Sequence, residues 1–223
     1  WYNGYLINGL HMYNPNSVSM AIERHRFDSY WKNTSSFASI NTFITMNYDG
    51  LKDDIMTMLS DGMVYVNTDT FQNDFVSISS KDEALTALIH LGYLGYNIDE
   101  KNAFVPNFEV KKAYQAALCT SGWSKVADSI SRCDELLQAT INGDSEKVAE
   151  LIEKAHDAYT SILKYNDENS LSCVLTMAYF TAPGYYNIIR EMPAGKGFAD
   201  FVFIPRSNAG FRPAMVVELK YNK

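Results

Sequence analysis

Three charged residues stand inside apolar, strand-like runs near the end of the sequence. Asp200 lies in "GFADFVFIP", residues 197–205, and Glu218 and Lys220 lie in "AMVVELK", residues 214–220. A carboxylate buried without a partner costs several kcal/mol, so these charges require either partner side chains or a ligand. The turn-forming segment "RSNAG" separates the two runs, which predicts a β-hairpin.

Strand geometry predicts that the three charges meet. Side chains on a strand alternate between faces, so Glu218 and Lys220 share one face. A turn centred near Ala209 places Asp200 directly across from Glu218, with the two Cβ atoms about 4.5–5.5 Å apart. Facing carboxylates repel each other unless a cation lies between them, and Mg²⁺ typically takes one or two carboxylates together with waters and phosphate oxygens. A lysine two residues further along can hold an attacking water and stabilise charge developing on a phosphate.

An ion-pair network is the alternative interpretation of the same spacing. In that arrangement Lys220 bridges Glu218 and Asp200 at the end of the sheet, and no metal is bound. Charged pairs are common on sheet faces, and a Glu-x-Lys tripeptide has little specificity by itself. The spacing alone therefore leaves a metal site and a salt-bridge network both open.

The elements that must position these charges follow from the surrounding pattern. Residues 168–180 predict a helix that ends before Pro183 and Gly184. A strand over 185–191, a loop over 192–197 and the two strands of the hairpin complete the sequence. This α-β-β-β order predicts a small α/β domain in which a helix packs on a sheet.

The chain before this domain is predicted to be mostly helical, which makes the whole an α+β protein with a boundary near residues 164–167. Helices are expected after an N-cap at Ser17, over 51–60, over 81–91 with Gly92 at the end, from about Phe108, and over 124–164 with a break at Asp144 and Ser145. Short strands are expected over 62–68 and 103–106.

Composition and charge narrow the class of protein. The net charge of −7 argues against a general nucleic-acid coat protein. Residues 1–164 carry a balance of −8, from 13 Lys+Arg and 21 Asp+Glu, whereas residues 165–223 carry +1, from 6 and 5. The C-terminal part is therefore the part that tolerates a polyanion. Three widely spaced cysteines form neither a disulfide framework nor a CxxC site, and no apolar run is long enough to span a membrane, which favours a reduced, cytoplasmic location.

Several further motifs carry a resemblance to a known family. They are "WYNGYLI", "YNPNSV" and "YWKNTSSF", then "LIHLGYLGYN" and "FVPNFEVKKAY", and finally "YNDENSLSCVL", "REMPAGKGFADFVFIP" and "MVVELK". In this order they resemble bacterial proteins that join an AAA-ATPase-like domain to a C-terminal PD-(D/E)XK nuclease-like domain. The resemblance implies three parts: the end of an ATPase-like module over 1–45, a mostly helical middle region over 46–164, for which a winged-helix-like arrangement is one expectation, and a nuclease-like domain over 165–223 that is truncated at its C-terminus.

The resemblance also implies roles for individual residues. Asp200 takes the place of the superfamily's metal-binding Asp, and Glu218 and Lys220 take the places of the acid and the lysine of the (D/E)XK motif. Glu168, at the start of the preceding helix, matches the acid that completes the metal shell, although an acid at a helix N-terminus is also explained by the helix dipole. Glu191 is a further acid that can face the site from the end of its strand.

The function expected from the resemblance is hydrolysis of phosphodiester bonds, in DNA, with Mg²⁺ or Mn²⁺ as the cofactor. The expected partners are nucleic acid and an upstream ATPase domain, and no membrane is expected. One departure from the family pattern bears on activity: Phe198 stands where relatives carry a basic residue, and Lys196 is the nearest substitute. The alternative is therefore a catalytically inactive nuclease-like module that binds nucleic acid or a protein partner.

Overall fold

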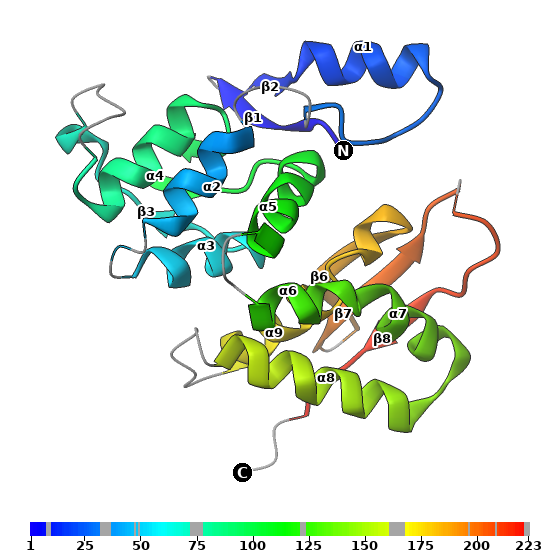
Figure 1. Cartoon of the computed structure of the whole chain (residues 1–223). Coiled ribbons are helices and arrows are strands. Elements are labelled where there is room, and N and C mark those ends of the chain that lie inside the picture. The colour runs from blue at the N-terminus through cyan, green and yellow to red at the C-terminus, as the bar shows by residue number, and fades with distance from the viewer. Residues whose placement is uncertain are drawn as a thin grey trace. The chain divides into compact units, whose positions relative to one another are not determined.

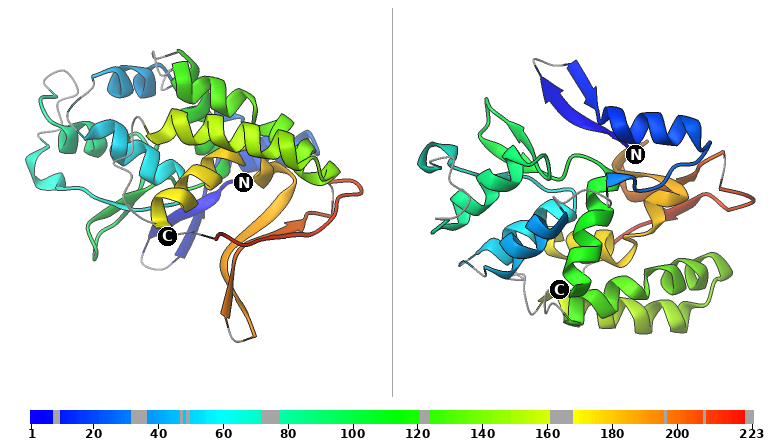
Figure 2. Two further views of the ribbon diagram at one scale, coloured as in Figure 1. Left: turned by 90° about the horizontal axis from the view of Figure 1, so that it is seen from below. Right: turned by 45° about the horizontal axis from the view of Figure 1, so that its top comes forward.

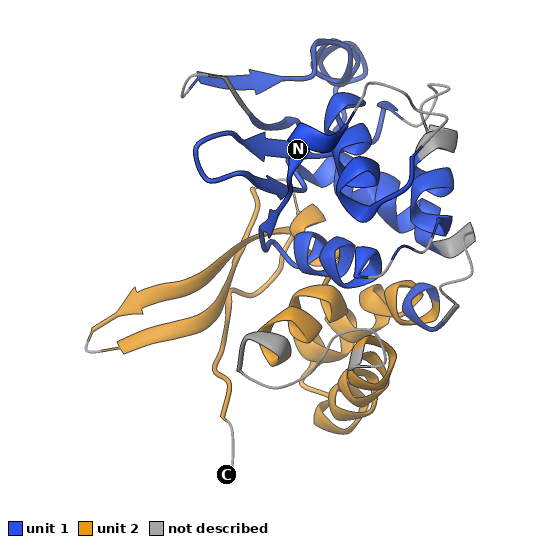
Figure 3. Ribbon diagram, turned by 90° about the vertical axis from the view of Figure 1, so that its left-hand side faces the viewer, with its two compact units in different colours: residues 1–127 blue, residues 128–223 orange. Residues whose placement is uncertain are grey.

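The computed structural model describes residues 1–7, 10–31, 37–46, 48, 50–71, 78–120, 124–160, 168–195, 197–207 and 209–220. The chain divides into two compact units, unit 1 over residues 1–127 and unit 2 over residues 128–223 (Figure 3). Helices and small antiparallel sheets occur in both units, so the expected α+β class is confirmed (Figure 1). None of the described helices is both long and apolar enough to cross a membrane.

Unit 1 contains a two-stranded hairpin, a small three-stranded sheet and several helices (Figures 1 and 2). Its elements are β1 (Asn3–Ile7), β2 (Leu10–Tyr13), α1 (Pro15–Glu23), α2 (Phe37–Thr45), α3 (Leu51–Leu59), β3 (Val64–Tyr65), the 3₁₀ turn η2 (Thr68–Thr70), α4 (Lys81–His90), β4 (Gly95–Asn97), β5 (Asn102–Phe104) and α5 (Phe108–Thr120). Helix α6 (Ser124–Ser131) crosses the division between the units. The three-stranded sheet has the order β3-β5-β4.

Local sequence signals explain the ends of α4. Ser80 caps α4 by accepting from the backbone N–H of Glu83, and Gly92 follows the helix with a φ of +78°, a conformation that glycine adopts without strain. Helix α1 corrects one expectation, because its N-cap is Asn14 rather than Ser17. The Asn14 side chain accepts from the N–H groups of residues 16 and 17, and Pro15 occupies the first helical position.

A buried carboxylate explains why Ser17 is not the cap. Ser17 is fully buried and its hydroxyl donates to Glu109 Oε1 on α5, at 3.0 Å. The same oxygen accepts from the backbone N–H of Tyr30, at 2.7 Å, and of Trp31, at 2.9 Å. Glu109 is itself fully buried. One carboxylate therefore fastens α1 and the segment that follows it to α5, which lies far away in the sequence.

Unit 2 consists of helices and a three-stranded antiparallel sheet with the order β6-β7-β8. Its elements are α7 (Cys133–Asn142), α8 (Ser145–Thr160), α9 (Glu168–Ala178), the 3₁₀ turn η3 (Ala182–Gly184), β6 (Tyr186–Ala194), β7 (Gly197–Pro205) and β8 (Met215–Val217). The break between α7 and α8 falls as expected, with Gly143 at a φ of +74° and Asp144 accepting from the N–H of Lys147.

The sheet of unit 2 has one covered face and one open face. On β7, Ala199, Phe201 and Phe203 are buried, whereas the residues between them are partly or fully exposed. The covered face packs against α9 and the turn after it, because the Tyr179 ring meets the Phe203 ring edge-on at 5.3 Å and Arg190 donates to Ser172. This face supplies the apolar core that fixes the strands.

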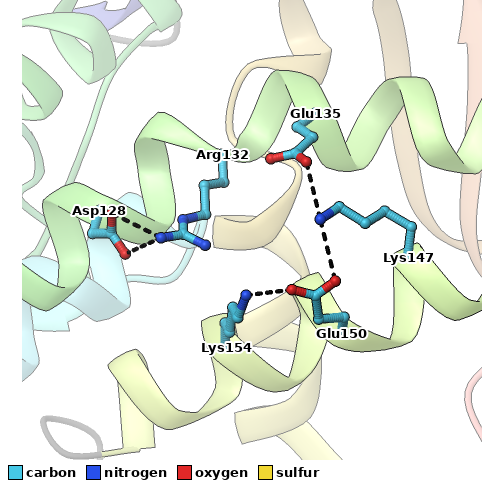
Figure 4. A network of polar contacts seen from close by, with 6 residues as sticks. All are labelled: Asp128, Arg132, Glu135, Lys147, Glu150 and Lys154. Atoms are coloured by element: carbon cyan, nitrogen blue, oxygen red, sulfur yellow. Dashed lines mark hydrogen bonds and ion pairs between the residues drawn. The ribbon is translucent and has the colours of Figure 1, made fainter.

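A network of ion pairs joins α7 to α8 in unit 2 (Figure 4). Lys147 on α8 reaches Glu135 on α7 at 3.1 Å and Glu150 at 3.2 Å, and Glu150 also pairs with Lys154. These hydrogen bonds raise the pKa of Lys147 and lower the pKa of Glu150 from their ordinary values. Because these side chains lie at the surface, we assign the network to orientation of α7 and α8 rather than to chemistry.

The compact units divide at residue 127, and within unit 2 α7 packs on α8 and α8 packs on α9. The boundary expected near residues 164–167 lies outside the described residues and stays a prediction. The family-based division into 1–45, 46–164 and 165–223 stays a prediction. The expected loop over 192–197 is wrong, because the β6–β7 pairing continues to Ala194 and Gly197. The resulting long hairpin projects away from the helices of its unit (Figures 2 and 3).

Candidate functional site

The register between β7 and β8 is the one that the hairpin arithmetic predicts. The paired residues on β7 and β8 are Phe201 with Val217 and Val202 with Val216. Continued one residue past the end of β8, this register would set Glu218 across from Asp200. The expected strand over 214–220 is shorter than predicted, since β8 ends at Val217.

Asp200 is held in place by the backbone that follows β8. The N–H of Leu219 donates to Asp200 Oδ2 at 2.6 Å, which keeps the chain beside β7 for two residues beyond the strand. No hydrogen bond to the other oxygen, Oδ1, is recorded among the described residues. Because Asp200 is only partly buried, Oδ1 remains available to a ligand on the open face.

Lys220 lies beside both acids. Its Nζ donates to Glu218 Oε2 at 2.7 Å, and both side chains are exposed. The hydrogen bond to Glu218 raises the pKa of Lys220 above its ordinary value of 10.5, and the charges of Glu218 and Asp200 act in the same direction. Lys220 therefore carries a positive charge at neutral pH, which suits it to stabilise negative charge rather than to remove a proton.

Glu191 stands at the same level of the sheet on the other side of Asp200. Its neighbours on β6 pair with the neighbours of Asp200, namely Arg190 with Phe201 and Met192 with Ala199. Glu191 has a φ of +50°, a left-handed conformation that costs about 1 kcal/mol or more in a residue with a side chain. Glu191 is thus the β6 residue next to Asp200, but its left-handed backbone interrupts the regular pairing of β6 with β7 at this position.

The roles expected of Glu168 and Lys196 lie outside what the structure describes. Glu168 begins α9, as expected, but its side chain is not among the described ones, and Lys196 falls in the β6–β7 connection outside the described residues. Their contributions to metal or phosphate binding stay predictions. Among the side chains that are described, no group of three His, Cys, Asp or Glu residues gathers closely enough to hold a metal ion by itself.

The donor set at Asp200 and Glu218 fits a divalent cation on chemical grounds. Mg²⁺ takes oxygen ligands and usually keeps several waters, so one or two carboxylates suffice when phosphate oxygens supply the rest. Asp200 has one oxygen without a recorded partner, and Glu218 has one oxygen beyond the atom that Lys220 contacts. The same contacts give each acid one partner, Lys220 for Glu218 and the Leu219 N–H for Asp200. The ion pairs of the described residues do not include the bridge from Lys220 to Asp200 that the ion-pair interpretation predicts.

Sequence reasoning missed two features that bear on function. The Leu219 N–H that fixes Asp200 is a backbone group, for which the sequence carries no signal.

The second feature is an open cavity of about 1090 Å³ in unit 1. It is lined by residues of α1 and by aromatic side chains, namely Trp1, Tyr2, Tyr13 and Phe27. The lining includes Trp1 and Phe27, whose rings stack 6.1 Å apart. These rings only partly serve core packing, because Phe27 is half exposed.

Comparisons of the chain with protein-family models, with curated protein sequences and with solved structures found no match in any of the three. The family resemblance of the motifs therefore stays a prediction, and the arguments about function depend on the site itself.

Proposed function

We propose that unit 2 is a metal-dependent phosphodiesterase that acts on nucleic acid, with its site on the open face of the β6-β7-β8 sheet. The observation that carries this proposal is the β7–β8 register, which would set Glu218 across from Asp200 if continued one residue past β8, together with the hydrogen bond from the charged Lys220 to Glu218. The α9-β6-β7-β8 order supports a nuclease-like domain of the PD-(D/E)XK type. The order of α2, α3 and the β3-β5-β4 sheet supports a winged-helix-like arrangement in unit 1.

Each side chain has a separate task in this proposal. Asp200 and Glu218 hold Mg²⁺ or Mn²⁺, which supplies Lewis-acid activation of water and of the phosphate when bound. Lys220 keeps its proton and orients the attacking water while stabilising charge on the phosphate oxygens. The Leu219 N–H fixes the rotamer of Asp200, so that the free oxygen faces the ligand. Glu168 and Glu191 are the residues that would complete the metal shell.

The test is cleavage of labelled DNA and RNA, single- and double-stranded, by the whole chain in Mg²⁺ or Mn²⁺. Asp200→Asn and Lys220→Ala are each expected to reduce cleavage about 100-fold or more, since each removes a group that acts in the transition state. Lys154→Ala removes a surface lysine of the same unit and serves as the matched control. Cleavage that survives both Asp200→Asn and Lys220→Ala would contradict the proposal.

A second function has its own supporting observation. Lys220 and the Leu219 N–H satisfy the two acids without a metal, and Phe198 replaces the basic residue of the family pattern. These contacts support a nuclease-like module that binds nucleic acid or a protein partner without catalysis. Nucleic-acid binding in EDTA that is equal in wild type and Asp200→Asn, together with no cleavage in either metal, would favour this second function.

A further inference from the structure

The tip of the β6–β7 hairpin presents an aromatic ring to solvent. Phe198 on β7 is 68% exposed, and its cross-strand partner on β6 is Pro193. The described residues of the tip, from Glu191 to Phe198, are all exposed, and the hairpin projects away from the rest of its unit (Figure 3). An exposed Phe on a projecting hairpin is not explained by the core of unit 2.

Phe198 shares its sheet face with the candidate metal site. It precedes Asp200 by two residues on the same strand, so the two side chains point to the same face at a separation of about 7 Å along the strand. Ala199, which lies between them, is buried and points to the covered face. The aromatic ring and the acids therefore form one continuous surface.

The charges of this surface limit what it can bind. A phosphate chain is repelled by Asp200 and Glu218 unless a metal ion lies there, and the exposed Lys220 is already paired with Glu218. Affinity for a nucleic acid must then come from another source. An exposed aromatic side chain on a sheet face offers stacking to a base, which is available for every base type and does not depend on charge.

We propose that Phe198 is a stacking platform for an unpaired nucleobase next to the phosphate handled at Asp200 and Glu218. The faces of a base inside a duplex are covered by its neighbours, so only an unpaired base can stack on this ring. The substrate class of the site is therefore single-stranded nucleic acid or a single-stranded end. This inference rests on the proposed function, since it gives the same site its substrate.

The experiment measures binding of the whole chain to a fluorescent single-stranded oligonucleotide and to the matching duplex, at one fixed salt concentration, in Mg²⁺ and in EDTA. Lys220→Ala is introduced throughout to prevent cleavage while the proposed metal ligands Asp200 and Glu218 stay in place. Added Phe198→Ala is expected to weaken single-strand binding about 10-fold and to leave duplex binding unchanged. Phe198→Trp is expected to restore binding, because it keeps an aromatic face. Phe211→Ala is the matched control, since Phe211 is a fully exposed Phe elsewhere in unit 2.

The outcomes separate this inference from the proposed function. Asp200-dependent cleavage with no effect of Phe198→Ala on single-strand binding overturns the stacking role alone. Phe198-dependent binding without any cleavage by the wild type overturns the catalytic proposal alone. If Phe198→Ala weakens the binding of single strand and duplex equally, the ring does not select an unpaired base and the inference is overturned. If Phe198→Ala changes the sedimentation coefficient but not the binding, the ring serves a contact between protein chains, which also overturns the inference.

Discussion

The carboxylates of the two units show two different uses of an acid among apolar residues. In unit 1, Glu109 is fully buried, and one of its oxygens accepts three hydrogen bonds from groups distant in the sequence. In unit 2, Asp200 accepts one recorded backbone hydrogen bond and faces an open sheet surface beside Lys220. Oε1 of Glu109 is surrounded by donors, while its Oε2 is buried without a hydrogen-bond partner among the described residues. The oxygen that Asp200 keeps lies on a partly exposed side chain, so the two acids differ in their access to solvent.

The difference teaches how a structural acid is told from a candidate catalytic one. Removing an acid that holds a fold together lowers the free energy of unfolding, because its donors are left without an acceptor. An acid that serves a ligand contributes little to folding, because its interactions form only when the ligand is present. Substitutions of the two acids therefore test this contrast directly.

The largest expected effect on stability is that of Glu109→Ala. It removes the acceptor of Ser17, Tyr30 and Trp31 from a buried site, so we expect a loss of about 3 kcal/mol in the free energy of unfolding of unit 1. Urea denaturation followed by tryptophan fluorescence measures it, since all three tryptophans of the chain precede residue 128. Glu23→Ala, an exposed acid on α1, is the control. A urea midpoint of the variant equal to that of wild type would contradict the structural role of Glu109.

A smaller loss is expected from Ser17→Ala. The variant deletes one of the three donors and leaves the two backbone N–H groups in place, so we expect a cost of about 1.5 kcal/mol by the same denaturation measurement. In the double variant with Glu109→Ala the two costs should not add, because the same hydrogen bond is removed twice. Full additivity would show that the Ser17–Glu109 contact does not contribute.

Asp200→Asn should change stability by only about 0.5 kcal/mol or less, because the amide oxygen of Asn can still accept from the Leu219 N–H. Thermal unfolding followed by far-ultraviolet circular dichroism provides the measurement. A loss of stability as large as that of Glu109→Ala would place Asp200 among the structural acids and remove the contrast between the two units.

The smallest effect is a shift in the titration of Lys220. Its pKa is raised mainly by the hydrogen bond to Glu218, so Glu218→Gln should lower the pKa of Lys220 toward 10.5. In the wild type the ion pair is therefore complete below pH 10.5 and is lost as the pH rises through the higher pKa of the folded state. Nuclear magnetic resonance of the lysine side chains measures this shift, with Lys154 in wild type and variant as an internal reference. An unchanged pKa for Lys220 would contradict the pairing.

Much of the local structure could be predicted because its causes are local. The N-cap signal at Ser80, the C-terminal Gly92 and the break at Asp144 each act within a few residues of the helix that they bound. The Asp200–Glu218 register could also be predicted, because hairpin geometry and strand alternation fix it once the centre of the turn is known. These features needed no knowledge of the remaining chain.

The features that could not be predicted depend on distant contacts. Ser17 resembles an N-cap in sequence, but its hydroxyl is used by Glu109, 92 residues away. Pro193 and its neighbouring glycines indicated a loop, yet β6 is an edge strand, where a residue without an N–H is tolerated, so the hairpin extends past it. Helices α7 and α8 group with the sheet through packing that no local pattern reveals.

Titration calorimetry with MgCl₂ and MnCl₂ tests the central claim most directly. Wild type is expected to show one saturable divalent site whose heat is lost in Asp200→Asn and in Glu218→Gln. Glu146→Gln, an exposed acid at the start of α8, should retain the site. Heats that are the same in wild type, Asp200→Asn and Glu218→Gln would contradict a metal site on the open face of the sheet.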